Sequence, residues 1–214
     1  ADLNNKFYTR ENTVINQENK TITNKFVVPD EKTTVTVTKI WDDNNNEAKK
    51  RPTSVTLQVK NGTAIVGEAT VTEKSGWKHD FTLTRYDANG NDINYTVDEA
   101  DLNNKYYAKG NVDQTAKTIT NVSKYGKVVV HYYIMNTDGT TTEMKVPDVN
   151  GNEIADSIVE GAQGEEYTTN PATNVKQNYE LVETPTNATG TITAEDTAWF
   201  FWLVGCYCSW WICW

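Results

Sequence analysis

Cysteine is missing from almost the whole chain. The three cysteines, Cys206, Cys208 and Cys213, all lie at the C-terminal end of the 214 residues. The body of the protein therefore has neither disulfides nor cysteine-based metal sites to support it. Hydrophobic residues make up 37% of the sequence and aromatic residues 11%, so hydrophobic cores of useful size can still form. A chain without disulfides needs those cores or another kind of covalent link.

The chain also has fewer basic than acidic residues. The chain has 20 Lys and Arg against 29 Asp and Glu, a net charge of -9 and a pI near 4.8. Phosphate binding needs a basic face, so nucleic acid and anionic membranes are excluded as main partners. The first 30 residues are polar and lack the apolar core of a signal peptide.

The only long apolar segment is the tail 199–214, WFFWLVGCYCSWWICW. It is shorter than the roughly 20 residues that span a bilayer, so we predict no membrane span. Trp and Cys dominate its composition, which favours an atypical, frameshifted end over a functional segment. Its first part, Trp199–Val204, is alternatively the last strand of the preceding module.

A strand predicted at 33–41 carries a lysine where a core residue is expected. Thr and Val alternate along TTVTVTKIW, and this period of two is typical of a half-buried β-strand. The alternation places Lys39 on the same face as Val35 and Val37, so Lys39 points inward. A buried ammonium is costly unless it is paired, neutralised or chemically consumed.

Two later strands place further reactive groups inward in the same way. In NYTVDE the apolar face continues from Val97 to Glu99, and in TITN it continues from Ile119 to Asn121. An amine, a carboxamide and a carboxylic acid are what an intramolecular Lys–Asn isopeptide bond requires. The neutral amine attacks the amide carbon, ammonia leaves, and the acid carries the protons. Burial favours this reaction because it lowers the pKa of a lysine and raises that of a glutamic acid.

Four segments together resemble a Cna B-type domain of Gram-positive surface adhesins. They are VTVTKIWDDNNN, RPTSVTLQV, YDANGNDINYTVDEA and the closing TITN. The resemblance implies a β-sandwich in which the lysine of the first strand and the asparagine of the last strand form a self-generated crosslink, assisted by the glutamate of a YxVxE box. The matching positions are Lys39, Asn121 and Glu99, with Glu99 as the proton shuttle.

An internal repeat indicates a tandem array of similar modules. ADLNNKFY at the start of the sequence matches ADLNNKYY at 100–107, and KTITN occurs twice, ending at Asn24 and at Asn121. We therefore interpret 1–29 as the C-terminal remnant of a preceding Cna B-type repeat with a linker, and 30–124 as a complete sandwich. Asn24 is then the orphan acceptor of the preceding repeat, and we expect it to be unbonded.

The chain after the sandwich resembles a MucBP domain, a family associated with mucin-binding proteins of gut bacteria. The resemblance rests on VVVHYY, a DG turn, GNEIADS, GEEYTT, and NYELV followed by NATG. It implies a small β-grasp, ubiquitin-like domain at 125–198. Tyr132, Tyr133, Tyr167 and Tyr179 are candidates for stacking on sugars, although aromatic residues on strands belong more often to the core or to cross-strand pairs.

Catalytic and metal-binding constellations are not recognisable in the sequence. The acidic loops DDNNNE at 42–47 and DVNGNE at 148–153 do not follow the spaced calcium-loop pattern, so we interpret both as solvated turns. Ser/His/Asp triads, paired catalytic carboxylates and Gly-rich phosphate loops are missing too. We expect no cofactor, no metal and no enzyme activity beyond single-turnover self-crosslinking.

The fold is predicted to be mainly β, a Cna B-type sandwich followed by a β-grasp domain. Two functions fit this organisation. The first is a stalk segment of an adhesin at the bacterial cell surface, a stable spacer whose partners are host mucin or another glycoprotein and neighbouring repeats. The alternative is an accessory, non-catalytic region of a secreted or wall-bound enzyme such as a glycosidase.

The strands predicted for the sandwich are 33–41, 53–59, 64–72, 77–84, 93–98, 105–109 and 114–122.

Overall fold

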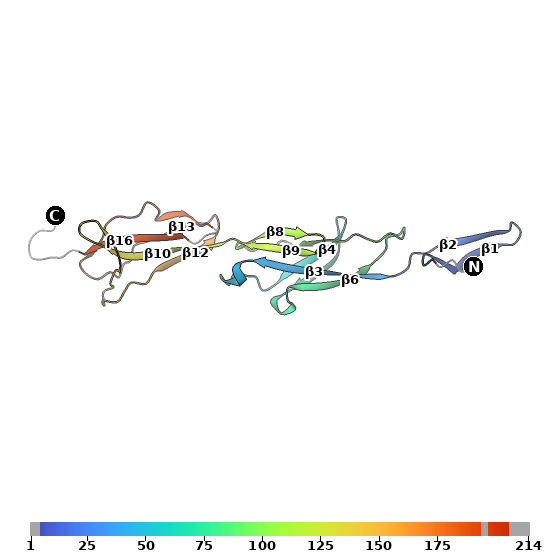
Figure 1. Cartoon of the computed structure of the whole chain (residues 1–214), viewed down its shortest axis with the longest axis horizontal. Coiled ribbons are helices and arrows are strands. Elements are labelled where there is room, and N and C mark those ends of the chain that lie inside the picture. Colours follow the sequence, from blue (N-terminus) through green and yellow to red (C-terminus); the bar gives the residue numbers. More distant parts are fainter. Residues whose placement is uncertain (1–4, 194–196, 206–214) are drawn as a thin grey trace, which may run out of the picture. The chain divides into compact units, whose positions relative to one another are not determined.

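Strands dominate the computed structural model, which describes residues 5–193 and 197–205 (Figure 1). Two short 3-10 turns, Asn44–Asn46 and Glu73–Ser75, are the only helical elements in these ranges. None of the helices there has the length and apolarity to cross a membrane. The chain is therefore mainly β, as predicted. The three cysteines lie outside the described residues.

An N-terminal hairpin pairs β1 (Tyr8–Asn16) with β2 (Thr21–Phe26) in an antiparallel two-stranded sheet. By the internal repeat it corresponds to the hairpin β8–β9 of the sandwich. Ile22 of β2 is 68% exposed, whereas its counterpart Ile119 is fully buried. The difference arises because a two-stranded sheet has no second layer to cover its apolar face.

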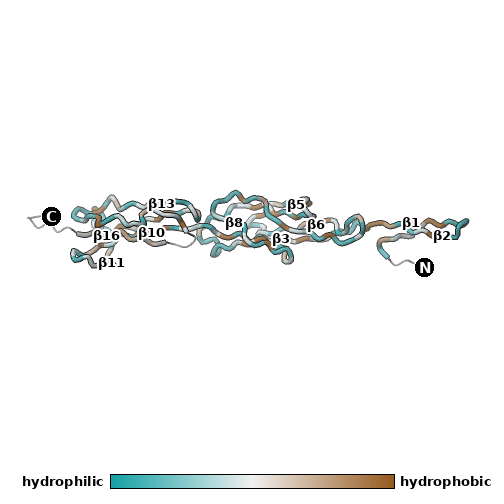
Figure 2. The backbone as a smooth tube through the Cα atoms, turned by 90° about the horizontal axis from the view of Figure 1, so that it is seen from above, coloured by the Kyte–Doolittle hydropathy of each residue, from teal (hydrophilic) through white to brown (hydrophobic). Residues whose placement is uncertain are grey.

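Two facing sheets form the first module. One has the strand order β6-β3-β9-β8 and the other the order β5-β4-β7. Hydropathic colouring places most apolar residues along strands and polar residues in the loops (Figure 2). The strands are β3 (Lys32–Asp42), β4 (Val55–Asn61), β5 (Ala64–Val71), β6 (Lys78–Thr84), β7 (Thr96–Glu99), β8 (Tyr107–Asp113) and β9 (Thr118–Ser123).

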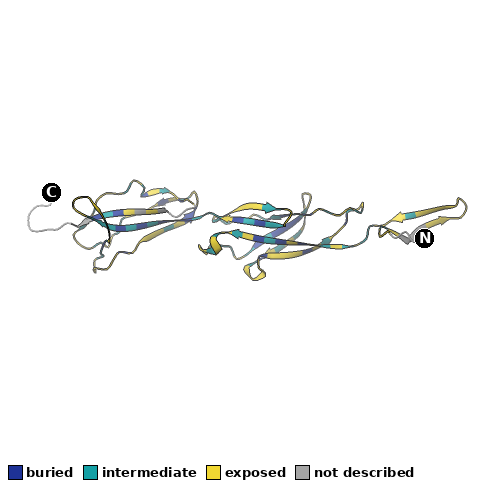
Figure 3. Cartoon of the chain, viewed as in Figure 1, coloured by how far each residue is buried: buried dark blue, intermediate teal, exposed yellow. Residues whose placement is uncertain are grey.

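The core of this module lies between the two sheets. Alternate residues of β3 and β9 are buried, which Figure 3 shows as interrupted dark bands along the strands. Val37 and Ile119 from one sheet and Leu57 from the other have no exposed surface. The two sheets thus bury one face each, as the period-two pattern requires.

A mixed sheet forms the second module. Its order is β11-β10-β16-β14, and β12 also pairs with β10. Strands β10 and β16 lie parallel at its centre. The strands are β10 (Tyr125–Met135), β11 (Thr141–Lys145), β12 (Ser157–Ala162), β13 (Glu166–Thr168), β14 (Tyr179–Leu181), β15 (Thr189–Thr191) and β16 (Thr197–Gly205).

Strand β16 extends beyond the module end that the sequence placed at 198. Trp199–Val204 pair with β10, as the alternative interpretation of this segment predicted. Phe201 is fully buried and Leu203 is 2% exposed, because both belong to the module's core. The boundary therefore moves to Gly205 or later, since an end at 198 cuts through the central strand. The remainder of the apolar tail, 206–214, lies outside the described residues.

Two adjacent phenylalanines of β16 test this placement. Phe201→Ala is expected to destabilise the second module by about 3–5 kcal/mol, because it removes a fully buried ring. Phe200→Ala is the matched control: its ring is 42% exposed, so the loss is expected to stay below about 1 kcal/mol. Urea unfolding followed by the amide NMR signals of β10 measures both. Equal losses of stability in the two variants would contradict the assignment of Phe201 to the core and Phe200 to the surface.

Candidate crosslinking site

Lys39 enters the core from β3. The strand alternates regularly, so Val35 and Val37 precede Lys39 on the inward face, as predicted. Its side chain has no exposed surface. The ammonium lies 4.8 Å from the centroid of the Trp41 ring and donates to the carbonyl oxygen of Ile119 at 3.3 Å. An aromatic face and one carbonyl replace only part of the water that a lysine loses on burial.

Glu99 approaches Lys39 from the facing sheet. It ends β7, where Val97 is the preceding inward residue. Its side chain is 2% exposed, and its Oε2 atom lies 3.0 Å from Lys39 Nζ. A buried carboxylate and a buried ammonium at this distance compensate each other's charge.

Asn121 completes the cluster from β9, the neighbour of β3 in the first sheet. The side chain is fully buried and its Nδ2 donates to Glu99 Oε1 at 2.7 Å. Glu99 therefore contacts Lys39 with one carboxylate oxygen and Asn121 with the other. The structure thus brings together the three residues that the alternating patterns placed inward.

The pKa of Lys39 departs strongly from that of a free lysine. Burial lowers it to about 8, against the opposing effects of the hydrogen bond and charge of Glu99. The positive charge of Lys109 also lowers the pKa of Lys39, as burial does. A substantial fraction of this amine is thus neutral, and able to act as a nucleophile, at a pH only slightly above 7.

The three buried residues lie within a segment that matches a known protein family. The family model of the Cna protein B-type domain matches 35–122, which runs from inside β3 to inside β9 and includes all three buried residues. Residues 35–122 form a Cna protein B-type domain. The chain is 44% identical over 87 residues to the collagen adhesin of Staphylococcus aureus. The alignment spans 40% of this chain and only 7% of that adhesin.

Solved structures that the chain matches include two B repeat units of the collagen binding protein Cna of Staphylococcus aureus. The match has 20% identity and a TM-score of 0.41, and covers 94% of this chain and 56% of that one. The pilus adhesin SpaC of Lactobacillus rhamnosus GG matches with 15% identity and a TM-score of 0.38, over 81% of this chain and 29% of that one.

Asn24 lies apart from such a cluster. It is half-buried on β2, opposite Thr13 of β1. Lys39 and Glu99 come from β3 and β7 of the Cna B-type domain, and the two-stranded sheet of the hairpin has no counterpart of either strand. Among the described residues, Asn24 therefore lies in a different sheet from those that carry Lys39, Asn121 and Glu99.

The acidic loop after β3 has a role that the sequence did not indicate. Arg51 donates to both carboxylate oxygens of Asp43, each at 2.6 Å, and the Tyr107 hydroxyl donates to Asp43 Oδ2 at 2.8 Å. Burial opposes ionisation, but these donors outweigh it and lower the pKa of Asp43. The Asp43 side chain is 2% exposed, so this carboxylate anchors the loop from inside rather than lying in solvent, as a solvated turn would have it.

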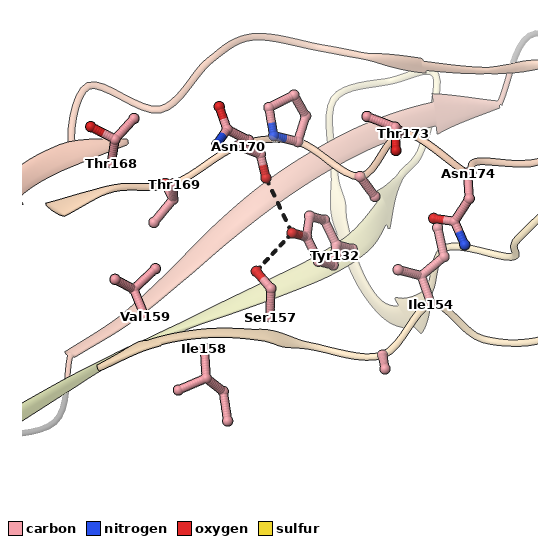
Figure 4. Close-up of a pocket in the computed structure, with 13 residues that line it drawn as sticks. Tyr132, Ile154, Ser157, Ile158, Val159, Thr168, Thr169, Asn170, Thr173 and Asn174 are labelled. Atoms are coloured by element: carbon pink, nitrogen blue, oxygen red, sulfur yellow. Dashed lines mark hydrogen bonds between the residues drawn. The ribbon is translucent and has the colours of Figure 1, made fainter. Parts of the chain in front are cut away.

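The candidate tyrosines of the second module divide into two groups. Tyr132 and Tyr167 are buried in its cores, whereas Tyr133 and Tyr179 are half-buried. Tyr132 borders a groove of about 400 Å³ between β12 and 168–174 (Figure 4).

In that groove the Tyr132 hydroxyl donates to the carbonyl oxygen of Asn170 at 3.1 Å and lies 2.9 Å from Ser157 Oγ. Both contacts are visible in Figure 4. Tyr132 thus ties β10 to the neighbouring segments, and its buried ring presents no open face for a sugar.

The lowered pKa of Lys39 predicts a pH dependence of stability before crosslinking. Between the folded pKa of about 8 and the reference value of 10.5, the unfolded chain binds more protons than the folded one. The free energy of unfolding of an Asn121→Ala variant should therefore rise with pH through this window, by on the order of 3 kcal/mol.

The matched control is the double variant Lys39→Met/Asn121→Ala, which retains every other titrating group. Denaturant unfolding of the two variants at several pH values between 7 and 11 isolates the contribution of Lys39. Parallel curves for the two variants would show that folding does not shift the pKa of Lys39.

Proposed function

We propose that the chain is a stalk segment of a Gram-positive surface adhesin, in which an isopeptide bond between Lys39 and Asn121 staples the Cna B-type domain. The observation that carries this proposal is the buried Glu99 carboxylate, which contacts the amine with one oxygen and the carboxamide with the other. The similarity to a collagen adhesin supports the cell-surface role.

The chemistry is a transamidation within the chain. The neutral Nζ of Lys39 attacks Cγ of Asn121, and an Nζ–Cγ amide bond replaces the Cγ–Nδ2 bond. Glu99 Oε2 takes the proton that the amine releases, and the same carboxyl group returns a proton to Nδ2, which leaves as ammonia. Atoms balance without oxidant or cofactor. Because Glu99 ends as it began and the product amide does not turn over, the domain is not an enzyme.

A bond between Lys39 and Asn121 joins the first strand of the sandwich to its last strand. Tension along the chain then passes through the covalent bond and bypasses the strands between. The closed loop of roughly 80 residues also constrains the unfolded state, which by the chain-entropy model used for disulfides stabilises by about 4–5 kcal/mol. Both effects suit a spacer that must stay folded under load.

Intact-mass spectrometry of the denatured protein tests the crosslink. The wild type is expected to be lighter than its sequence by the mass of one ammonia. Glu99→Ala removes the proton carrier and should restore the full mass. Glu99→Gln is the sharper variant, because it keeps the size and a hydrogen-bonding group but loses the carboxylate, and it should also restore the full mass.

Loss of a single ammonia is part of the expectation, since the proposal contains one bond, between Lys39 and Asn121. Asn24→Ala is the matched control and should leave the mass deficit unchanged. A correctly folded wild type with the full sequence mass would contradict the proposed bond.

The second module is proposed to supply weak glycoprotein binding at the cell surface. Its resemblance to MucBP domains and the half-buried Tyr133 and Tyr179 support this role. Host mucin or another glycoprotein is the external partner, and neighbouring repeats of the same chain are the internal one. Single sugar contacts are shallow, so adhesion depends on repeated modules that raise the effective concentration.

Display at different valency tests this role. The full chain, biotinylated at its N-terminus and held on streptavidin, is expected to be retained on a mucin-coated surface at least about a hundredfold better than the free chain. A deglycosylated mucin surface is the control and should retain neither. Absence of binding by the multivalent form would contradict the adhesive role and leave the stalk proposal in place.

A further inference from the structure

Four aromatic side chains lie together on the outward face of the second module. His131 and Tyr133 of β10 and Phe200 and Trp202 of β16 form this aromatic ladder. The register pairs His131 with Phe200 and Tyr133 with Trp202. Ring centroids are 5.2 Å apart in the first pair, 5.8 Å in the second, and 6.0 Å between Phe200 and Trp202. The rings therefore form one continuous aromatic surface across the two central strands.

Cross-strand pairing explains why these rings are neighbours but not why they remain accessible. The alternate residues of β16, Phe201 and Leu203, already form the core below the sheet. Phe200 is 42% exposed, and Tyr133 and Trp202 are half-buried. Accessible aromatic side chains grouped on one surface are typical of ligand contacts.

A hollow of about 500 Å³ adjoins the ladder, which is within the size range of small-ligand sites. Strand β11 borders it on the polar side. The lining combines three aromatic rings, one of them with a phenol hydroxyl, with two threonine hydroxyls and one carboxylate: Tyr133, Phe200, Trp202, Thr141, Thr142 and Glu143. Sugars need this combination, because their C–H faces pack on aromatic rings while their hydroxyl groups donate to acceptors such as a carboxylate.

Charge narrows the class of sugar. None of the six lining residues is basic. The nearby ammonium of Lys145 lies over the Tyr133 ring, 4.8 Å from its centroid, and contacts the Asp156 carboxylate, which also lies 2.8 Å from His131 Nδ1. Of the six lining residues only Glu143 is charged, and its exposed carboxylate repels anionic groups, while the Lys145 ammonium beside the hollow is neutralised by Asp156.

We propose that this hollow binds a neutral sugar unit, a hexose or an N-acetylhexosamine, and discriminates against sialylated and sulfated sugars. The inference rests on the proposed glycoprotein binding and names its site and its ligand class. The Tyr132 groove between β12 and 168–174 is the competing location within the module, and the experiment separates the two.

The test uses the full chain on streptavidin against an array of neutral glycans and their sialylated and sulfated counterparts. Phe200→Val and Trp202→Val remove one ring each but keep β propensity, and each is expected to weaken binding to neutral glycans about tenfold. Glu143→Gln keeps a hydrogen-bonding group and removes the charge. It should retain neutral binding and raise binding to sialylated glycans about threefold.

Two matched controls leave the hollow intact: Met144→Ala beside Glu143 on β11, and Ile158→Ala in the Tyr132 groove. Both side chains are exposed, at 65% and 57%, and both variants should bind like the wild type. Amide NMR spectra verify that each variant is folded. If Trp202→Val does not fold, Phe200→Val alone tests whether the hollow is the binding site.

Unchanged binding by folded Phe200→Val, or loss of binding only in Ile158→Ala, would overturn this site while the proposed function stands. A wild type that prefers sialylated glycans would overturn the ligand class. Ladder variants that abolish self-association in size-exclusion chromatography, with no effect on glycans, would make the ladder a contact between copies instead. No glycan binding by the folded wild type would overturn the inference and the proposed adhesive function together.

Discussion

Burial of the Lys39 ammonium between two sheets is the constraint on which the Cna B-type domain depends. A lysine with no exposed side-chain surface has lost its water, and the Glu99 carboxylate at 3.0 Å offsets that loss only in part. The free-energy cost of burial that remains lowers the pKa of Lys39 to about 8. The same burial that makes Lys39 unfavourable as a cation makes it a nucleophile, so the destabilising feature of the core and its proposed chemistry have one cause.

The sandwich architecture determines which groups meet. Neighbouring strands of one sheet carry Lys39 and Asn121, and the facing sheet carries Glu99 above both. Side chains on adjacent strands lie about 5 Å apart, close enough for an amine to reach an amide, while a third group fits only from the opposite layer. The second module is organised differently. Its central parallel strands bury Phe201 on one face and expose Phe200 on the other, so one strand serves both the core and the proposed binding surface.

Period-two alternation was sufficient to predict that Lys39, Glu99 and Asn121 point inward, because that property is local to each strand. It could not predict that β3 and β9 are neighbours or that β7 lies across from them, since these pairings join residues far apart in sequence. The tail was harder still: WFFWLV is apolar on both faces, so no alternation revealed that Phe201 is core and Phe200 surface. Strands β13, β14 and β15 have three residues each, which is too short for a hydrophobic alternation to be recognised.

In the proposed reaction, the buried contact between Lys39, Glu99 and Asn121 ends in a covalent bond between Lys39 and Asn121. Protease digestion of the denatured wild type, followed by tandem mass spectrometry, tests it at the level of single residues. We expect a branched peptide in which the β3 fragment is joined through Lys39 to the β9 fragment at Asn121. Recovery of both fragments only as separate, unmodified linear peptides from folded protein would contradict it.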